Sequence, residues 1–257
     1  MQTRSLAERL GYAPDARLVI LNCDDLGSSH AANLASLEAV EQGVATSATL
    51  MVPCPWAREA VDLFAGKDVG VHLTLTAEYR AYRWRSLTGA ASLHDDDGYL
   101  PDNTPAVFAK ATAPDVRAEC RAQIDQALAW GVDVTHLDSH MGANMTDPRF
   151  YEIYLELAEE YRVPVRMAGR GAEQQLGFPI HQPADDRGLV YPDDFVFRWK
   201  DSTADLMRRR VPKMAPGSVT EFLAHPVLDG PELRGYDRDA AQVRVDDHAC
   251  AVSPAVR

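Results

Sequence analysis

The sequence lacks membrane-directed segments and a surplus of positive charge. No uninterrupted apolar run is long enough to span a bilayer, and residues 1–15 contain no apolar core of a signal peptide. The 26 Lys and Arg residues are outnumbered by 38 Asp and Glu residues, which gives a formal net charge of −12. Nucleic acids and anionic membranes usually bind a basic face. We therefore expect a soluble, cytoplasmic protein that binds neither nucleic acid nor membrane.

Cysteine is also scarce, and two common nucleotide-binding signatures are absent. The four cysteines form no CxxC pair. Cys23 and Cys120 fall within apolar patterns, as small core residues do, and such scattered cysteines fit a reducing compartment. The sequence contains neither GxGxxG nor GxxxxGK[ST]. These absences argue against a dinucleotide-binding fold and against a P-loop.

What the sequence does contain is a regular alternation of strands and helices. Short apolar runs predict strands at about 17–23, 46–52, 69–75, 132–136, 163–167 and 219–224. Between the third and fourth of these, apolar residues at four-residue steps predict a helix over 114–130. This rhythm implies a parallel sheet, and polar motifs at the strand ends favour a TIM-barrel-like (β/α) barrel, regular or irregular, over an open sheet.

The alternation stops at 76–113, after the third strand. This stretch mixes aromatic residues with Arg, Asp, Gly and Pro. An irregular insert of this length in a compact enzyme is more often a functional lid than a neutral loop. We expect one domain over residues 1–257 with a lid-like insert at about 76–113. Further helices are expected at 202–210 and from 237 to about 251, while 169–201 has no clear pattern.

The most informative stretch is 18–27, which reads LVILNCDDLG. Its apolar run predicts a strand that is buried on both faces, and Asp24 and Asp25 mark the strand's end. Neighbouring side chains on a strand point to opposite faces. Both carboxylates can reach one site only if the chain turns there, which Gly27 permits. One carboxylate could then bind a metal while the other accepts a proton.

Three histidine settings also lie on strands or at their ends. His72 is in the third strand, His136 and His140 flank Asp138 after the fourth, and His225 ends the last. On an extended chain, side chains two residues apart share a face. Imidazole nitrogens with a carboxylate oxygen suit Zn, Fe, Co or Ni, and one carboxylate with retained waters also tolerates Mg. Asp138 is placed to accept the second N–H of a ligating histidine.

Each of these residues also has a simpler structural explanation. A lone histidine in an apolar strand, such as His72, is more often a core residue than a ligand, and the His136–His140 motif could be a hydrogen-bonded barrel rim. Arg166, a charge within 163–167, either extends to solvent at the rim or pairs with a site carboxylate. The agreement between four strands, each ending in a residue able to bind a metal or move a proton, favours a site.

The order of these motifs resembles that of the YdjC-like carbohydrate deacetylases, which include chitooligosaccharide and hopanoid-associated deacetylases. The matching segments are 22–27, 70–75, 135–140 and the pair His225-Pro226. They bracket most of the chain. Leu26 stands where the family usually has Phe, and Val227 stands where it often has Gly.

The resemblance implies a TIM-barrel-like fold and a hydrolase that uses one divalent metal ion, Mg or Zn, to remove acetyl from an N-acetylated sugar. The metal ligands that it implies are Asp25, His72 and His140. It implies Asp24 as the general base, His225 as the general acid and Arg166 as the arginine that orients the base. It places His136 behind the ligands rather than among them.

The residues leave two alternatives open. The same site could serve a metal-dependent amidohydrolase or esterase that acts on a non-sugar substrate. The chain could also be a sugar-binding homologue without activity, although an intact set of site residues speaks against this. A homo-oligomer is left open as well.

Overall fold

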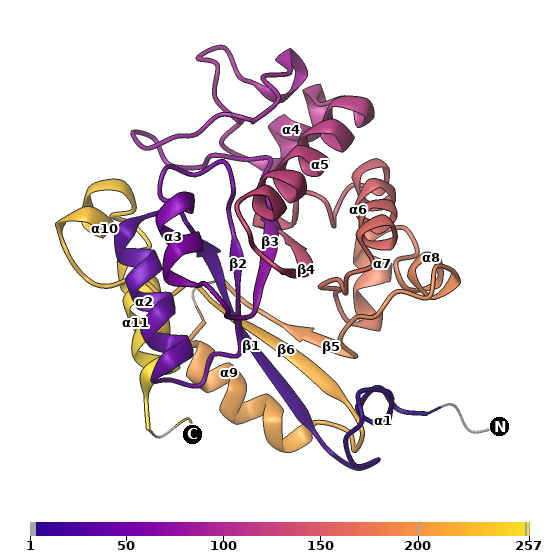
Figure 1. Cartoon of the computed structure of the whole chain (residues 1–257). Helices are drawn as coiled ribbons and strands as arrows, with labels where there is room; N and C mark the ends of the chain where they lie inside the picture. The colour runs from indigo at the N-terminus through magenta and orange to yellow at the C-terminus, as the bar shows by residue number, and fades with distance from the viewer. Residues whose placement is uncertain (1–3, 200, 255, 257) are drawn as a thin grey trace.

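The computed structural model describes residues 4–199, 201–254 and 256, and it shows an α/β fold built on one parallel sheet. The six strands are β1 (Leu18–Leu26), β2 (Ser47–Leu50), β3 (Val69–Leu73), β4 (Val134–Ser139), β5 (Asp194–Val196) and β6 (Val219–Ala224). Their order across the sheet is β4-β3-β2-β1-β6-β5, and every pair is parallel. The sheet curls into a half-barrel with helices packed around it (Figure 1).

Five of the six predicted strands are confirmed, and the one predicted at 163–167 is wrong. There, only Val165 forms an isolated bridge, with Leu137 of β4. The N–H of Val163 is already bonded to the end of the preceding helix, at Ala158, and Pro164 has no N–H to donate. β5 was not predicted, because it has only three residues and lies in the unpatterned stretch 169–201. Within the described residues no strand pairs β4 with β5, so the strands do not close a barrel.

The helices follow the predicted alternation. They are α1 (Leu6–Arg9), α2 (His30–Glu41), α3 (Ala57–Leu63), α4 (Thr104–Lys110), α5 (Ala113–Ala129), α6 (Pro148–Tyr161), α7 (Glu173–Leu176), α8 (His181–Asp186), α9 (Thr203–Arg210), α10 (Pro231–Tyr236) and α11 (Ala241–Val252). Short 3-10 turns η1 (Ala91–Leu93), η2 (His140–Gly142), η3 (Arg170–Ala172) and η4 (Val211–Lys213) lie between them. The helices expected at 114–130, 202–210 and 237–251 are confirmed as α5, α9 and α11.

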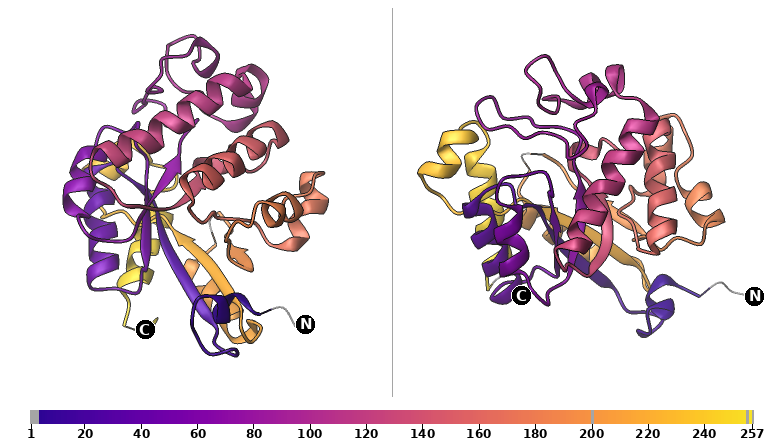
Figure 2. Two further views of the ribbon diagram at one scale, coloured as in Figure 1. Left: turned by 45° about the vertical axis from the view of Figure 1, so that its right-hand side comes forward. Right: turned by 45° about the horizontal axis from the view of Figure 1, so that its top comes forward.

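The last helix returns to the beginning of the fold. α11 lies beside α2 in both views (Figures 1 and 2), and the N–H of Val44, just after α2, donates to the carbonyl of Ala251 over 2.9 Å. Side chains of α11 therefore approach the carboxyl end of β1, more than 200 residues earlier in the chain.

The main core lies between the sheet and its helices. Leu21, Val71, Ile124 and Phe222 are fully or almost fully buried in it. Cys23 and Cys120 are also buried, as predicted, and the cysteines are free thiols. None of the helices in the described residues combines the length and apolarity needed to cross a membrane.

The insert at 76–113 is packed against the rest of the molecule rather than extended into solvent. It lies at the top of Figure 1, beyond the ends of β2 and β3. Trp84 is buried, and its indole N–H donates to the carbonyl of Thr76 over 2.8 Å. The hydroxyl of Tyr82 donates to the carbonyl of Ser28 over 2.6 Å, which ties the insert to the segment after β1.

Candidate metal and catalytic site

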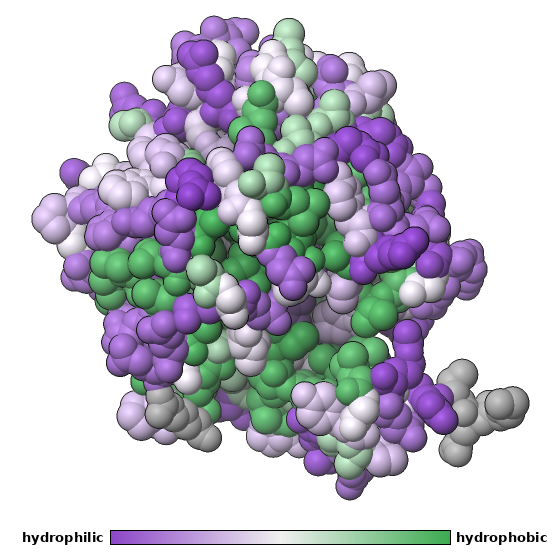
Figure 3. All heavy atoms as spheres, in the orientation of Figure 1, coloured by the Kyte–Doolittle hydropathy of each residue, from purple (hydrophilic) through white to green (hydrophobic). Residues whose placement is uncertain are grey.

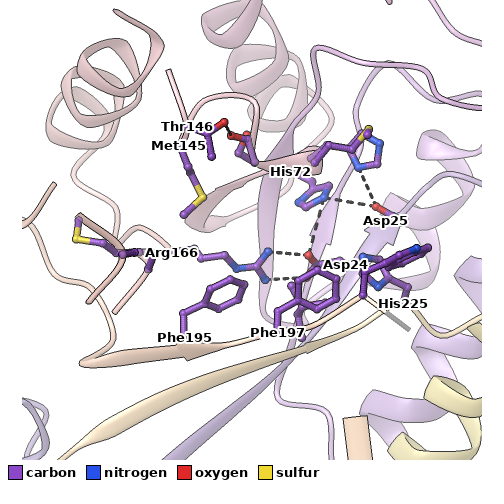
Figure 4. A pocket seen from close by; sticks show the side chains of 18 of the residues that line it. Asp24, Asp25, His72, Met145, Thr146, Arg166, Phe195, Phe197 and His225 are labelled. Atoms are coloured by element: carbon purple, nitrogen blue, oxygen red, sulfur yellow. Dashed lines mark hydrogen bonds and ion pairs between the residues drawn. The ribbon is translucent and has the colours of Figure 1, made fainter. Parts of the chain in front are cut away.

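A cavity of about 730 Å³ lies at the carboxyl ends of the strands. The centre of the face in Figure 3 is hollowed, and hydrophobic side chains gather around the hollow. All of the site residues predicted from the sequence line this cavity, namely Asp24, Asp25, His72, His140, Arg166 and His225. Figure 4 shows five of them, Asp24, Asp25, His72, Arg166 and His225, facing the same space.

The two neighbouring aspartates share the cavity because the backbone turns at Asp25 itself. Asp25 has a positive φ of 62°, and the pairing of β1 with β2 shifts register between Cys23 and Leu26. Aspartate tolerates this left-handed conformation better than most residues, and such strain concentrates at functional sites. The sequence predicts that Gly27 permits the turn. Gly27 also has a positive φ of 89°, but the turn begins two residues before it.

Three potential ligand atoms meet at Asp25. Its Oδ1 lies 3.4 Å from Nε2 of His72 and 3.1 Å from Nδ1 of His140. Among the residues that the structure describes, Asp25 Oδ1 and His72 Nε2 are buried without a hydrogen-bond partner. Buried polar atoms are rarely left in this state without a cost in free energy. A divalent cation would satisfy them, and two imidazole nitrogens with one carboxylate oxygen are a donor set that fits Zn, or Mg with added waters.

Both imidazole rings are held from behind by carboxylates. His72 and Asp138 are direct neighbours across the β3–β4 pair, and His72 Nδ1 lies 2.5 Å from Asp138 Oδ1. His140 Nε2 lies 2.9 Å from Glu78 Oε2. Ligating histidines typically donate their second N–H to a carboxylate in this way. Asp138 therefore supports a histidine on the adjacent strand rather than one in its own motif.

His136 takes no part in this cluster. Its Nδ1 is 2.8 Å from the Thr135 hydroxyl and 3.8 Å from Asp68. It is absent from the described residues that line the cavity.

Asp24, His72 and Asp138 form a second group whose spacing would also suit a metal ion. The two carboxylates of this group are already paired with the guanidinium of Arg166. Both oxygens of Asp24 accept hydrogen bonds from Arg166, over 2.6 and 2.7 Å, and Arg166 Nη1 is 2.9 Å from Asp138. A divalent ion placed there would meet the guanidinium. The group around Asp25 is therefore the better metal site.

Arg166 pairs with carboxylates rather than extending to solvent, which settles the alternative left open by the sequence. It is buried, its Nε donates to Glu221 over 2.7 Å, and its guanidinium lies 5.0 Å from the ring of Phe195. Burial raises the pKa of the Glu221 carboxyl to about 7, against the opposing charge of Arg166. Asp24 also accepts a bond from the Asn22 amide, over 2.8 Å, so its orientation is fixed on both sides.

His225 follows β6 and lies on the side of Asp24 opposite to Arg166 (Figure 4). Its ring packs edge-on against Phe197 and Trp199, with centroids 5.6 and 5.3 Å away. Its backbone N–H donates to Asp247 Oδ2 over 2.8 Å, and its Nδ1 is 3.8 Å from the same oxygen. Asp247 therefore anchors the backbone of this residue, while its buried Nδ1 has no hydrogen-bond partner among the described residues.

The charges around the proposed ligands hold protons on the metal-free histidines. Burial alone would lower the pKa of His72, but the charge of Asp138 outweighs it and raises the pKa to about 9. For His140, burial is outweighed by Glu78 and Asp25, and the pKa rises to about 10. The pKa of Asp25 lies well below its usual value, because the charges of His140 and His225 overcome the effect of burial. The site thus pairs imidazolium with carboxylate until another cation replaces the protons.

Two contacts to the ligands come from residues that the sequence reasoning missed. Glu78 is in the irregular insert. Arg244 is on α11, and it is buried with Nη1 donating to Asp25 Oδ2 over 2.9 Å, Nε to Asp237 over 2.7 Å and Nη2 to the Tyr79 hydroxyl over 2.6 Å. A signal for Arg244 was available: Arg244 and Asp247 are three residues apart on the helix face that also carries Cys250 and Ala251. Charged residues on a buried helix face usually have partners.

Comparisons with known proteins agree with the motif order. A model of YdjC-like proteins matches residues 18–257. A carbohydrate deacetylase of Thermus thermophilus is 44% identical over 170 residues, which is 65% of this chain and 60% of that protein. One from Geobacillus stearothermophilus is 31% identical over 244 residues, 93% of this chain and 90% of that protein. A crystal structure from Enterococcus faecalis, described as a candidate cellobiose-phosphate cleavage protein, superposes with a TM-score of 0.80 at 25% identity and covers 93% of this chain and 92% of that one.

Proposed function

The chain belongs to the family of YdjC-like proteins, and we propose that it is a metal-dependent hydrolase that removes acetyl groups from N-acetylated sugars or oligosaccharides. Relatives that carry the name carbohydrate deacetylase support a hydrolase that acts on carbohydrate. The observation that carries the metal dependence is the meeting of Asp25 Oδ1, His72 Nε2 and His140 Nδ1 at one buried point.

In this proposal Asp25, His72 and His140 hold one divalent ion, Mg or Zn. When bound, such an ion polarises the scissile carbonyl and lowers the pKa of the attacking water. Asp138 and Glu78 keep the second nitrogen of each imidazole occupied, so that the free nitrogen faces Asp25. Arg244 occupies Asp25 Oδ2 and leaves Oδ1 for the ion.

Asp24 is the proposed general base. Its carboxylate lines the cavity within 4.0 Å of His72 Nε2, close to the proposed ion without belonging to the favoured ligand group. It accepts the proton of the water as that water attacks the acetyl carbonyl. Arg166 positions both of its oxygens, and a fixed orientation is what an efficient base requires.

His225 is the proposed general acid. Its ring lines the cavity and packs against two aromatic residues, and its backbone N–H is bonded to Asp247. It donates a proton to the departing nitrogen, which leaves as the free amino group of the sugar while acetate forms. Phe197 and Trp199, beside His225, also offer flat apolar surfaces on which a sugar ring can stack.

We extend the proposal to the architecture of the chain. Residues 1–257 form one deacetylase domain, and the curled sheet is an incomplete, irregular (β/α) barrel. The insert at about 76–113 acts as a lid, because Glu78 and Tyr79 at its start line the cavity.

A second candidate is a metal-dependent amidohydrolase or esterase acting on a non-sugar substrate. Much of the cavity wall away from the aspartates is apolar, including Met145, Met167, Leu176 and Ile180. Apolar walls of this kind suit an acyl amide or ester at least as well as a free sugar. The same three ligands would serve either reaction, so only the substrate distinguishes them.

The decisive experiment measures acetate release from the mono-, di- and trisaccharides of N-acetylglucosamine. The purified protein is assayed before chelation, after chelation, and after Mg or Zn is restored, beside a panel of acyl amides and acetyl esters. Release from sugars that disappears with the chelator and returns with the metal supports the proposal. Release from the non-sugar panel alone supports the second candidate. Sugar binding without release identifies an inactive homologue.

A further inference from the structure

Glu78 lies in the insert, outside the strand-end motifs, yet its carboxylate contacts a proposed metal ligand. Its Oε2 is 2.9 Å from Nε2 of His140, while Nδ1 of the same ring is 3.1 Å from Asp25 Oδ1. The side chains of Glu78 and His140 are 21% and 5% exposed. The contact is therefore shielded from bulk water at the edge of the cavity.

This contact determines which nitrogen of His140 carries a hydrogen. An ionised carboxylate only accepts hydrogen bonds, so Nε2 of His140 must be the donor to Glu78. When the ring is neutral, its lone pair is then on Nδ1 and faces the oxygen of Asp25. Two acceptor atoms at this distance repel each other unless a proton or a metal ion lies between them.

Apart from Glu78 and from Asp25, which faces Nδ1 and would share that nitrogen with the ion, no other described side chain offers His140 a hydrogen-bond acceptor. The rings of His72 and Trp84 lie 5.3 and 6.4 Å away between centroids and contribute packing without a hydrogen-bond acceptor for Nε2. Asp138 performs the corresponding role for His72, from β4. Each imidazole of the proposed site thus has its own carboxylate, one from the sheet and one from the insert.

The backbone around Glu78 is fixed on both sides. The N–H of Ala77 donates to the carbonyl of Pro101 over 2.8 Å, which closes the base of the insert. The hydroxyl of Tyr79 accepts a bond from Arg244 over 2.6 Å, and its ring packs 4.8 Å from that of Tyr236. Glu78 is therefore presented to His140 from a rigid segment.

We propose that Glu78 is a positioning residue of the metal centre, which holds His140 with hydrogen on Nε2 and the lone pair of Nδ1 directed at the ion. This inference rests on the proposed metal site but not on the identity of the substrate. It also gives the insert a second role: the segment proposed as a lid supplies part of the support of the metal site.

The test compares the zinc affinity of the wild type with that of Glu78→Gln, measured by competition with a chromogenic chelator. The glutamine has the same shape but lacks the charge, and we expect affinity to fall by about 10- to 100-fold, the usual range for the loss of a carboxylate behind a ligating histidine. Glu78→Asp keeps the charge on a shorter side chain and should fall between the two. The matched control is Glu59→Gln, because Glu59 contacts Nδ1 of His30 over 2.8 Å outside the cavity. The control should bind zinc as the wild type does.

A second readout reports the hydrogen bond to Glu78 directly. In the zinc-loaded protein, ¹H–¹⁵N NMR should show hydrogen on Nε2 of His140 in the wild type and in Glu78→Gln, and that hydrogen should exchange with water faster in Glu78→Gln because its carboxylate acceptor is gone. Equal zinc affinity and equal exchange of the Nε2 hydrogen in the wild type and Glu78→Gln would overturn the role of Glu78 while leaving the metal site intact. A wild type that binds no zinc would overturn the metal site, and the role of Glu78 with it.

Discussion

Replacing Asp25 by Asn is expected to abolish tight metal binding, because the amide oxygen must face Arg244 and the NH₂ group must face the metal site. Arg244 donates to Asp25 Oδ2 over 2.9 Å, and in the variant only the amide oxygen can accept that bond. The NH₂ group then takes the place of Oδ1, which lies 3.1 and 3.4 Å from the ring nitrogens of His140 and His72. There it presents N–H hydrogens in place of a ligand oxygen, so it offers the ion no lone pair.

The size of the effect follows from what is lost. The change removes one of three proposed protein ligands and the only carboxylate among them. Losing a partner behind a ligand already costs about 10- to 100-fold in affinity, so losing the ligand should cost at least about 100-fold, or about 2.8 kcal/mol. Activity should fall with metal occupancy, and excess metal should restore part of it.

Asp24→Asn should behave in the opposite way. Asp24 is outside the favoured ligand group, so the ion should remain bound. The loss of a general base should lower activity by about 10²- to 10⁴-fold, and added metal should not restore it. The new NH₂ group would also face Arg166, whose two bonds to Asp24 are buried. Breaking a buried ion pair costs about 3–5 kcal/mol, so a lower urea midpoint should accompany the loss of activity.

Calorimetric metal titration beside acetate release, on both variants, decides between the two roles. If Asp24→Asn loses the ion while Asp25→Asn keeps it, the roles of the two aspartates are reversed. If both variants bind metal as the wild type does, the ion is held by other residues and the proposed site is wrong.

Three further predictions follow from the surroundings of the site. Arg244→Met leaves Asp25 and Asp237 without their buried partner, and it should lower the free energy of unfolding, measured in urea, by about 3–5 kcal/mol. The control Arg234→Met breaks only an exposed pair with Asp229 and should change the free energy of unfolding little. Equal losses in the two variants would contradict the importance of burial. His225→Ala should lower kcat by about 10²- to 10⁴-fold with metal retained, and a substrate with an activated leaving group should be less affected; equal loss on both substrates argues against a general acid. In the metal-free protein His72 and His140 have pKa values raised from 6.5 to about 9 and about 10, so their contribution to stability is full below pH 6.5 and is lost as pH rises through 9 and 10. Urea midpoints should therefore fall between pH 7 and pH 10, and a flat profile would show that the two rings are not held as imidazolium.

The meeting of the site residues could be predicted from strand order, whereas the choice of ligands among them came from the resemblance to the YdjC-like family. In a parallel sheet the carboxyl ends of the strands lie along one edge, so residues at the ends of β1, β3 and β4 meet whatever the loops do. A correct assignment of three apolar strands brings Asp25, His72 and His140 to this edge, and the resemblance selected them from their neighbours Asp24 and His136. The precise turn could not be predicted, because an aspartate at positive φ leaves no mark in the sequence pattern.

The errors in the fold come from segments where composition and context disagree. Residues 163–167 have the composition of a strand, but the cap of α6 at Arg162 and the missing N–H of Pro164 leave only Val165 to bridge β4. β5 is too short to show a periodic pattern and is held by its pairing with β6. Tertiary pairing, not local preference, determines both segments.

Glu78 and Arg244 were missed because only tertiary structure brings the insert and α11 to the ends of the strands. The charges of the site show why it needs both residues. Asp24, Asp25, Asp138 and Glu78 place carboxylates around two imidazole rings, and Arg166 and Arg244 offset only part of that charge. In the metal-free protein protons on His72 and His140 supply the remaining cations. A divalent ion that displaces those two protons brings the same charge that they remove, so the net charge around the buried carboxylates does not change. The site can therefore remain folded without the ion and accept it without rebuilding its surroundings, provided that Glu78 and Arg244 keep each ligand facing the same point.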